Sequence, residues 1–250
     1  MSSRTLWALS DLHLSLSCRD KDMAHFGEAW KDYQERIAFH WKDLVGENDL
    51  VLLAGDLSWA MKLEDALIDL KWIDNLPGEK ILIKGNHDPW WSSRKKMESV
   101  LPPSMRAIFT DPIEVGSLSI GGTRLWDHPL TFCPTLIEWC GKDSIPSPSW
   151  TEHDEKIFLR EMERMRSILK KMPSDKTKII MTHYPPLHPS LEPSTPCSEL
   201  FEQEGVSVVV FGHLHNLKKG LVPFGEKNGI NYLFTAADYL EFQPLKILSF

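Results

Sequence analysis

The stretch that most constrains the fold is residues 80–88, in which an apolar run ends at a glycine and three polar side chains. Ile81, Leu82 and Ile83 suit an interior strand, and Gly85 permits a sharp turn. The amide, imidazole and carboxylate that follow would be costly to bury without partners. The stretch therefore predicts a buried strand that leads into a loop of metal-binding or catalytic side chains. These polar residues are Asn86, His87 and Asp88.

Four more segments have the same plan, because each is an apolar run that ends in side chains able to bind a metal. They are residues 6–13, 50–56, 179–183 and 206–215. Apolar side chains recur at spacings of three and four over 23–44 and 63–73, which predicts a helix in each of these stretches. The first 90 residues are thus expected to alternate strand and helix, which is typical of a layered α/β fold.

Three of the polar residues follow predicted strands directly: Asp11, Asp56 and Asn86. In open α/β sheets the functional crevice lies beyond the carboxyl ends of the strands. We therefore expect these three side chains to lie close together.

The second half of the chain adds one more helix and several strands. Phe158, Met162, Met165 and Leu169 recur at helical spacing, which predicts a helix that ends before Pro173. Stretches around 232–235 and 245–248 are predicted to be antiparallel strands that complete a sheet. Residues 127–150 are rich in proline and predict an irregular insertion. Its tryptophans either cap the site or pack against the domain surface, which is the commoner use; they are Trp126, Trp139 and Trp150.

Composition narrows the class of protein. With 250 residues and 42% hydrophobic content, the chain is expected to form a single α/β domain over 1–250. A net charge of −7 argues against a surface that coats nucleic acid. No 18-residue apolar stretch or signal pattern is present in the sequence, so we expect a cytoplasmic protein without a transmembrane segment, and protein partners stay open. Scattered cysteines favour reduced thiols, although Cys133 and Cys140 are close enough in sequence to pair.

The candidate ligands have the spacing and chemistry of a metal site. Asp11 and His13, like His213 and His215, are two residues apart, which on extended backbone directs both side chains to one side. Carboxylates, an amide and imidazoles together suit manganese, iron or zinc rather than calcium. Seven ligands are too many for one tetrahedral ion, but they fit two ions ~3.5–4 Å apart if one carboxylate bridges. The seven are Asp11, His13, Asp56, Asn86, His183, His213 and His215.

These motifs, in this order, resemble the motif set of the calcineurin-like metallophosphoesterases. The matching residues are Asp11-Leu12-His13, Gly55-Asp56, Gly85-Asn86-His87-Asp88, His183 and Gly212-His213-Leu214-His215. The resemblance spans nearly the whole chain, and the set is far more specific than any one motif. It implies a four-layer α/β/β/α sandwich with two central mixed sheets and a dinuclear metal centre.

The resemblance also implies a role for each residue. Asp11, His13 and His215 would bind one metal, and Asp56 would bridge to the other. The second metal would be bound by Asn86, His183 and His213. His87 would be catalytic rather than a ligand, and Asp88 would orient its ring. Trp59 departs from the family pattern, in which many members carry an acidic or polar residue, and this leaves the substrate open.

The expected function is hydrolysis of a small phosphoester, with a phosphodiester favoured, by attack of metal-bound hydroxide. Two divalent transition-metal ions are expected, with manganese first and iron or zinc as alternatives. The alternative substrates are a diphosphate-linked lipid or a nucleotide pyrophosphate, and the alternative class is a non-catalytic scaffold of the same fold. The other histidines are expected to be structural, with His128 beside Asp127 as a minor candidate for substrate contact. Arg94, Lys95 and Lys96 either touch a distal phosphate or form a solvated helix face, which is the commoner role.

Overall fold

The computed structural model describes residues 3–21, 23, 27–138, 149–218, 220–221 and 223–250. Trp139, Cys140 and His25 lie outside the described residues, as does most of the predicted insertion after Glu138. The three described cysteines, Cys18, Cys133 and Cys197, are free thiols.

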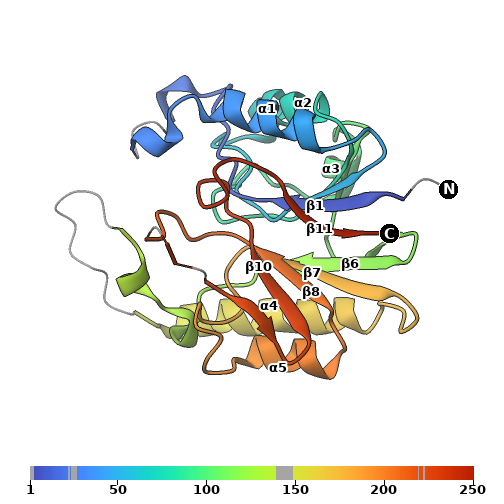
Figure 1. Cartoon of the computed structure of the whole chain (residues 1–250), viewed down its shortest axis with the longest axis vertical. Helices are drawn as coiled ribbons and strands as arrows, with labels where there is room; N and C mark the ends of the chain where they lie inside the picture. Colours follow the sequence, from blue (N-terminus) through green and yellow to red (C-terminus); the bar gives the residue numbers. More distant parts are fainter. Residues whose placement is uncertain (1–2, 22, 24–26, 139–148, 219, 222) are drawn as a thin grey trace.

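Two mixed β-sheets form the centre of the molecule (Figure 1). The first has the order β11 (Leu245–Ser249), β1 (Thr5–Leu9), β2 (Leu50–Leu53), β3 (Glu79–Leu82), β4 (Met105–Ala107). The second has the order β5 (Ile113–Val115), β6 (Leu118–Thr123), β7 (Thr177–Thr182), β8 (Val208–Phe211), β10 (Ile230–Phe234), β9 (Gly225–Lys227). In each sheet the inner strands are parallel and antiparallel strands occur only at the margins.

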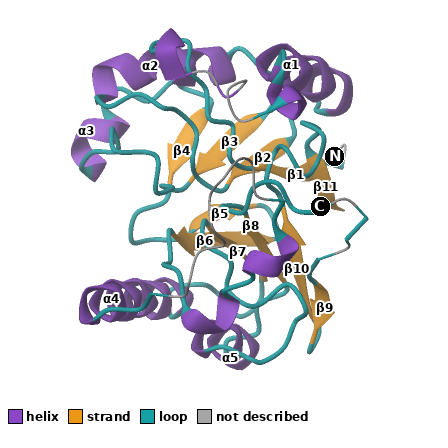
Figure 2. Cartoon of the chain, turned by 90° about the vertical axis from the view of Figure 1, so that its left-hand side faces the viewer, coloured by secondary structure: helices purple, strands orange, loops and turns teal. Residues whose placement is uncertain are grey.

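Helices cover the outer face of each sheet, so the fold has the expected four layers (Figure 2). The first sheet carries α1 (Tyr33–Leu44), α2 (Leu63–Asp74) and α3 (Arg94–Glu98). The second sheet carries α4 (Glu152–Leu169) and α5 (Pro196–Gln203). Short 3₁₀ turns lie at Arg19–Lys21, Glu28–Trp30, Pro129–Thr131 and Pro134–Leu136. Within the described residues, no helix is both long and apolar enough to cross a membrane.

The apolar runs are continuous because the first sheet is covered on both faces. In β1, Leu6 and Ala8 belong to the core between the sheets, whereas Trp7 and Leu9 pack toward α1 and α2. Val51 of β2 likewise packs in the core between the first sheet and its helices. Parallel strands buried on both faces read as unbroken hydrophobic stretches.

One prediction about an element was wrong, and a second was confirmed only in part. The helix expected over 23–44 begins only at Tyr33, because Gly27 (φ 130°) and Asp32 (φ 51°) adopt conformations that interrupt a helix. Met23 and Trp30 are buried nevertheless, which explains the apolar periodicity before the helix. The strand near 232–235 was expected to be antiparallel, and β10 is antiparallel to β9 but parallel to β8. The connection over 212–229 is long enough for the crossover that a parallel pair requires.

The two sheets meet at the carboxyl ends of their parallel strands. The Ser10 amide N–H, just after β1, donates to the Thr235 carbonyl just after β10, at 2.8 Å. The Gly212 N–H, after β8, donates to the His183 carbonyl after β7, at 3.1 Å. These hydrogen bonds join loops that carry the predicted ligands, so both sheets contribute to one site.

Candidate metal centre

Four of the seven predicted ligands have left-handed backbone conformations, which non-glycine residues adopt at a cost. The φ angles are 57° at Asp11, 45° at His13, 53° at Asp56 and 75° at His213. Hydrogen bonds hold these turns: the Asp11 and His13 N–H groups donate to the carbonyls of Gly55 and Asp56, each at 3.0 Å. Such strained positions cluster at functional sites.

One group of side chains converges at the ends of β1 and β8. The Nε2 atoms of His13 and His215 are 3.0 Å apart, and Oδ1 of Asp11 is 3.7 Å from Nε2 of His215. Ligand atoms of Asp11, His13 and His215 all lie within 4.8 Å of one another. This is the trio that the resemblance assigned to the first ion.

A second group converges at the ends of β3, β7 and β8. Oδ1 of Asn86 is 2.6 Å from Nε2 of His183 and 3.0 Å from Nδ1 of His213. Oδ2 of Asp56 lies between the two groups, 3.3 Å from Nε2 of His183 and 3.7 Å from Nε2 of His13. The structure thus brings all seven predicted side chains together and gives Asp56 the intermediate position.

The charges of the site are interdependent. Burial opposes protonation of His183, but Asp56 and Asp11 outweigh it and raise the pKa of His183 to about 9. Burial opposes protonation of His215 as well, and Asp238 outweighs it to raise the pKa to about 9. Burial and neighbouring histidines lower the pKa of His13 and that of His213. The carboxylates of the site thus favour positive charge on the groups that lie between them.

The donor set fits bound cations. His183 donates its Nδ1–H to the Ala54 carbonyl at 2.9 Å, so its Nε2 faces Asp56 and Asn86, where a bound cation would take the place of the Nε2 proton. His215 is held in the same way through Nδ1, so its Nε2 faces His13. Two imidazole nitrogens that face each other beside carboxylates are an arrangement that a metal ion would satisfy.

His87 lies beside the centre rather than in it. Its backbone N–H donates to Oδ1 of Asp56 at 2.7 Å, while its exposed ring lies 4.6 Å from the Trp59 ring and 5.7 Å from the His13 ring. Trp59 also stacks on His13 at 4.8 Å. The residue that departs from the family pattern therefore contacts both imidazoles, which also lie edge-to-face with each other.

Asp88 has different partners from those predicted. Its carboxylate accepts N–H groups from Asp56, Leu57 and Gly85 at 2.8–2.9 Å, together with those of Ser58 and the Trp90 indole. The prediction that Asp88 orients the His87 ring is thus not what the geometry shows. A fully buried carboxylate next to several backbone donors binds those first, and it fixes the turn that carries Asp56.

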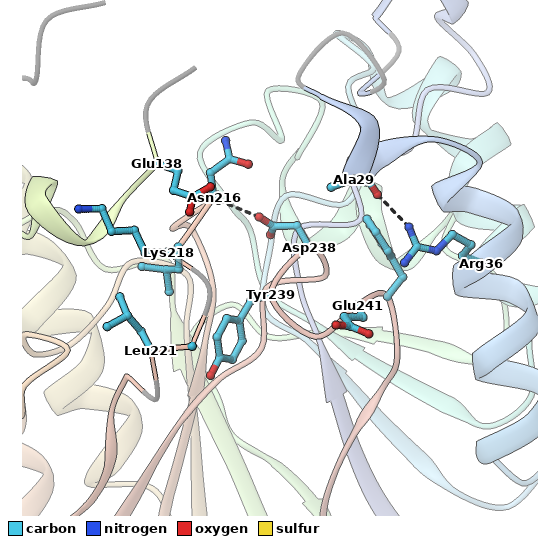
Figure 3. A pocket seen from close by; sticks show the side chains of 12 residues that line it. Ala29, Arg36, Glu138, Asn216, Lys218, Leu221, Asp238, Tyr239 and Glu241 are labelled. Atoms are coloured by element: carbon cyan, nitrogen blue, oxygen red, sulfur yellow. Dashed lines mark hydrogen bonds between the residues drawn. The ribbon is translucent and has the colours of Figure 1, made fainter. Parts of the chain in front are cut away.

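Asp238 is a residue that the sequence analysis missed. Its Oδ1 accepts the Nδ1–H of His215 at 3.0 Å, and its Oδ2 accepts the Asn216 N–H at 2.8 Å. It also lines a cavity of about 610 Å³, where it lies beside Asn216 and Tyr239 (Figure 3). Asp238 follows β10 closely, so its position at a strand end was the available signal, but no ligand motif accompanied it.

The minor candidates have structural partners. The Trp126 indole donates to Asp154 at 3.1 Å, and the Trp150 ring lies 6.0 Å from Phe158 of α4, so both pack on that helix. The His128 ring packs on the same Phe158 at 4.7 Å. Arg94 pairs with Asp111 at 2.6 Å on the surface, which agrees with the expected solvated helix face.

Comparisons with known proteins agree with this geometry. A family model described as calcineurin-like phosphoesterase matches residues 4–217. The Gene 66 protein of Mycobacterium phage L5 is 33% identical over 82 residues, which is 33% of this chain and 39% of that protein. The Gene 66 protein of Mycobacterium phage D29 is 36% identical over 85 residues, 33% of this chain and 40% of that protein. The matches thus cover about two fifths of each phage protein.

Solved structures share the fold at low sequence identity. The phosphopantetheinyl hydrolase of Mycobacterium tuberculosis aligns with a TM-score of 0.58 and 15% identity, over 98% of this chain and 96% of that one. A protein of unknown function from Aquifex aeolicus aligns with a TM-score of 0.51 and 15% identity, over 97% of this chain and 95% of that one. At such identity these likenesses establish the fold alone.

Proposed function

This chain belongs to the calcineurin-like phosphoesterase family. From this premise we propose that it is a metal-dependent phosphoric ester hydrolase that cleaves a small phosphodiester at a centre of two divalent transition-metal ions. The observation that carries the proposal is the position of Asp56. One carboxylate oxygen lies 3.7 Å from Nε2 of His13 and 3.3 Å from Nε2 of His183, within reach of both ligand groups.

Under this proposal the two groups hold one ion each. Asp11, His13 and His215 bind the first, and Asp56 bridges to the second. Asn86, His183 and His213 complete the second set. Two bound ions would supply a nucleophile at neutral pH and neutralise charge on the phosphate oxygens. The mixture of imidazole, carboxylate and amide donors favours manganese, with iron or zinc as alternatives.

The chain's own residues position the ester and donate a proton. His87, exposed beside the two ligand groups, donates a proton to the leaving oxygen. The Trp59 ring packs against both His87 and His13 and restricts the motion of the two imidazoles. The cavity beside Asp238 holds the organic part of the ester, because its volume of about 610 Å³ is typical of a small-molecule site. Arg36 lies over the Phe242 ring in its wall, at 4.5 Å.

The test is reloading of metal-stripped protein separately with manganese, iron and zinc. Each form is assayed on a phosphodiester, a phosphomonoester, a diphosphate-linked nucleotide and a phosphopantetheinyl ester, and its metal content is measured by elemental analysis. We expect close to two ions per chain and the highest kcat/KM on the phosphodiester. Fewer than one ion per chain would contradict the dinuclear centre, and a clear preference for another ester would contradict the diester assignment.

Asp56→Asn sharpens this test. As the proposed bridge, Asp56 should affect both ions, so metal content and activity should fall together. Asp49→Asn is the matched control, since Asp49 also accepts backbone and indole N–H groups but lies at the opposite end of β2. Unchanged affinity for two ions in Asp56→Asn would disprove the bridge while leaving the family assignment intact.

A further inference from the structure

A second cavity, of about 340 Å³, lies between α4 and the segments that follow β3, β4 and β6. Figure 2 shows α4 on the outer face of one sheet and β3 and β4 in the other, so this cavity joins the two halves of the sandwich. Its charged lining is strongly basic, and we call it the basic pocket: Lys84, Arg124, Arg160, Arg164 and a single acid among the described lining residues, Glu161.

The carboxylate of this acid, Glu161, already forms ion pairs with two of the arginines. The buried carboxylate of Glu161 lies 2.8 Å from Nη1 of Arg164 and 3.6 Å from Nε of Arg160. One negative charge therefore serves two guanidinium groups. The pocket keeps an excess of positive charge in a protein whose net charge is −7.

The other two cations form no ion pair with an acid in the described part of the chain. In the part of the chain that the structure describes, the Lys84 ammonium makes no hydrogen bond or ion pair, and the Arg124 guanidinium contacts the Trp126 ring alone, at 4.6 Å. Both side chains are partly buried. Grouping like charges in a partly desolvated cavity is unfavourable unless an anion compensates them.

The backbone ties this pocket to the metal centre. The Arg124 carbonyl accepts the N–H groups of His183 and Tyr184 at 3.2 and 3.1 Å. Lys84 is two residues before Asn86 on the same loop. An anion bound here would therefore contact residues at the edge of the catalytic loops without being a ligand of either ion.

We propose that the basic pocket binds a phosphate group other than the one that is cleaved. Planar guanidinium groups match the oxygens of a phosphate, and an ammonium adds a point charge. Ser92 adds a hydroxyl group to the lining. The phosphate is either a second phosphate of the substrate or free inorganic phosphate.

Calorimetry on the metal-loaded protein tests the site with inorganic phosphate at constant chloride ionic strength. We expect two phosphates per chain, one at the metal centre and one in the basic pocket. Arg124→Gln and Arg160→Gln should each weaken one of the two binding events about tenfold or more, since each removes a charged donor. Metal content, measured in parallel, checks that the variants are folded.

Arg166→Gln is the matched control. It removes the same charge as Arg160→Gln from the same helix, α4, but Arg166 does not line the basic pocket and pairs with Glu163 at 2.6 Å. One phosphate per chain in the wild type, or equal weakening in Arg166→Gln, would overturn the proposal. This calorimetric result does not depend on which ester is cleaved, so its failure leaves the proposed function untouched.

Kinetics distinguish the two sources of phosphate. If the pocket holds a second phosphate of the substrate, Arg160→Gln should raise the KM for a diphosphate diester. That increase should be at least about tenfold larger than the increase in the KM for bis(nitrophenyl) phosphate, which has one phosphate. If the pocket holds free phosphate, the two KM values should change equally while phosphate binding in the pocket is weakened in calorimetry. Either result supports a phosphate site.

Discussion

The Nδ1 nitrogen of His215 lies 3.0 Å from Oδ1 of Asp238, so a carboxylate at the end of β10 fixes the ring of a proposed metal ligand at the end of β8. The contact determines which imidazole nitrogen carries the proton and leaves Nε2 directed at His13. Carboxylate partners of this kind orient histidine ligands and increase their basicity.

We therefore expect Asp238→Asn to weaken binding of one of the two ions by about 10–100-fold. The neutral amide still accepts a hydrogen bond but no longer favours the charge distribution that a metal-bound imidazole needs. Metal titration followed by elemental analysis measures the loss, and Asp238→Glu should restore part of it. Asp49→Asn serves as the control. Equal loss of both ions would indicate that Asp238 merely supports the fold.

A second prediction concerns Asp88, whose carboxylate accepts the N–H groups of Asp56, Leu57 and Gly85. Asp88→Asn places an NH₂ group against backbone donors, so we expect a loss of roughly 2–4 kcal/mol in the free energy of unfolding. Because the Asp56 turn loosens, both ions should bind more weakly. Urea denaturation and metal content check these effects. A wild-type metal content would show that the turn does not need this carboxylate.

Most of the site was predictable because its residues follow apolar strands at short range. Parallel strands place their carboxyl ends at one edge, so residues such as Asp11 and His213 could be brought together without knowing any contact. Two features were not predictable. The partner of His215 is 23 residues away in sequence, at Asp238. The direction of the Asp88 carboxylate depends on which backbone N–H groups the folded turn exposes.

The fold, too, was predictable in some features and not in others. Runs such as Leu50–Leu53 predicted buried strands well, because periodicity reports burial. The stretch before Tyr33 shows the limit of this reasoning, since Met23 and Trp30 are buried without being in the helix. The parallel direction of β10 depends on the long connection after β8, which periodicity does not report.

Gly85 allows the close approach of two loops. A Cβ atom at this position would lie 2.0 Å from Oδ1 of Asp56 and 2.2 Å from its backbone nitrogen. Gly85→Ala must therefore displace Asp56, and we expect less than one ion per chain and loss of most activity. Gly46→Ala is the control, because a Cβ there meets its nearest atom, Oδ2 of Asp49, at an ordinary 3.5 Å. If Gly85→Ala keeps two ions at wild-type affinity, Asp56 is not the bridge.

Lys80 gives a pH-dependent prediction away from the metal centre. It is buried, with its ammonium near the Leu76 carbonyl and 3.3 Å from Oγ of Ser104, and burial lowers its pKa from 10.5 to about 8. Between these values the unfolded chain holds a proton that the folded chain has released. Raising the pH through this window therefore stabilises the folded wild type.

Lys80→Met lacks this titration, so it does not gain the stability that the wild type gains as the pH rises. The free energy of unfolding of the variant, relative to that of the wild type, should therefore fall by up to roughly 3 kcal/mol between pH 8 and 10.5. Urea denaturation of both proteins across this range measures the difference, and effects of other titrating groups cancel. A constant difference would show that Lys80 stays protonated in the folded chain.

The last prediction concerns His87, which is exposed beside the two ligand groups and makes its contact with Asp56 through the backbone rather than the ring. As a proton donor to the leaving oxygen, its effect should depend on the leaving group. A general acid contributes typically ~10²–10⁴-fold, mostly when the departing alkoxide is basic. His87→Asn should therefore reduce kcat far more on an alkyl phosphoester than on a nitrophenyl phosphoester.

Metal content separates this role from that of a ligand. The Asp56 contact uses the backbone N–H of residue 87, which asparagine retains, so two ions should remain bound in His87→Asn. Asp88→Asn provides the contrast, because it loosens the Asp56 turn and should lower kcat on both esters to a similar degree. Equal losses on both esters in His87→Asn would argue against proton donation, and loss of an ion would show that the ring is a ligand.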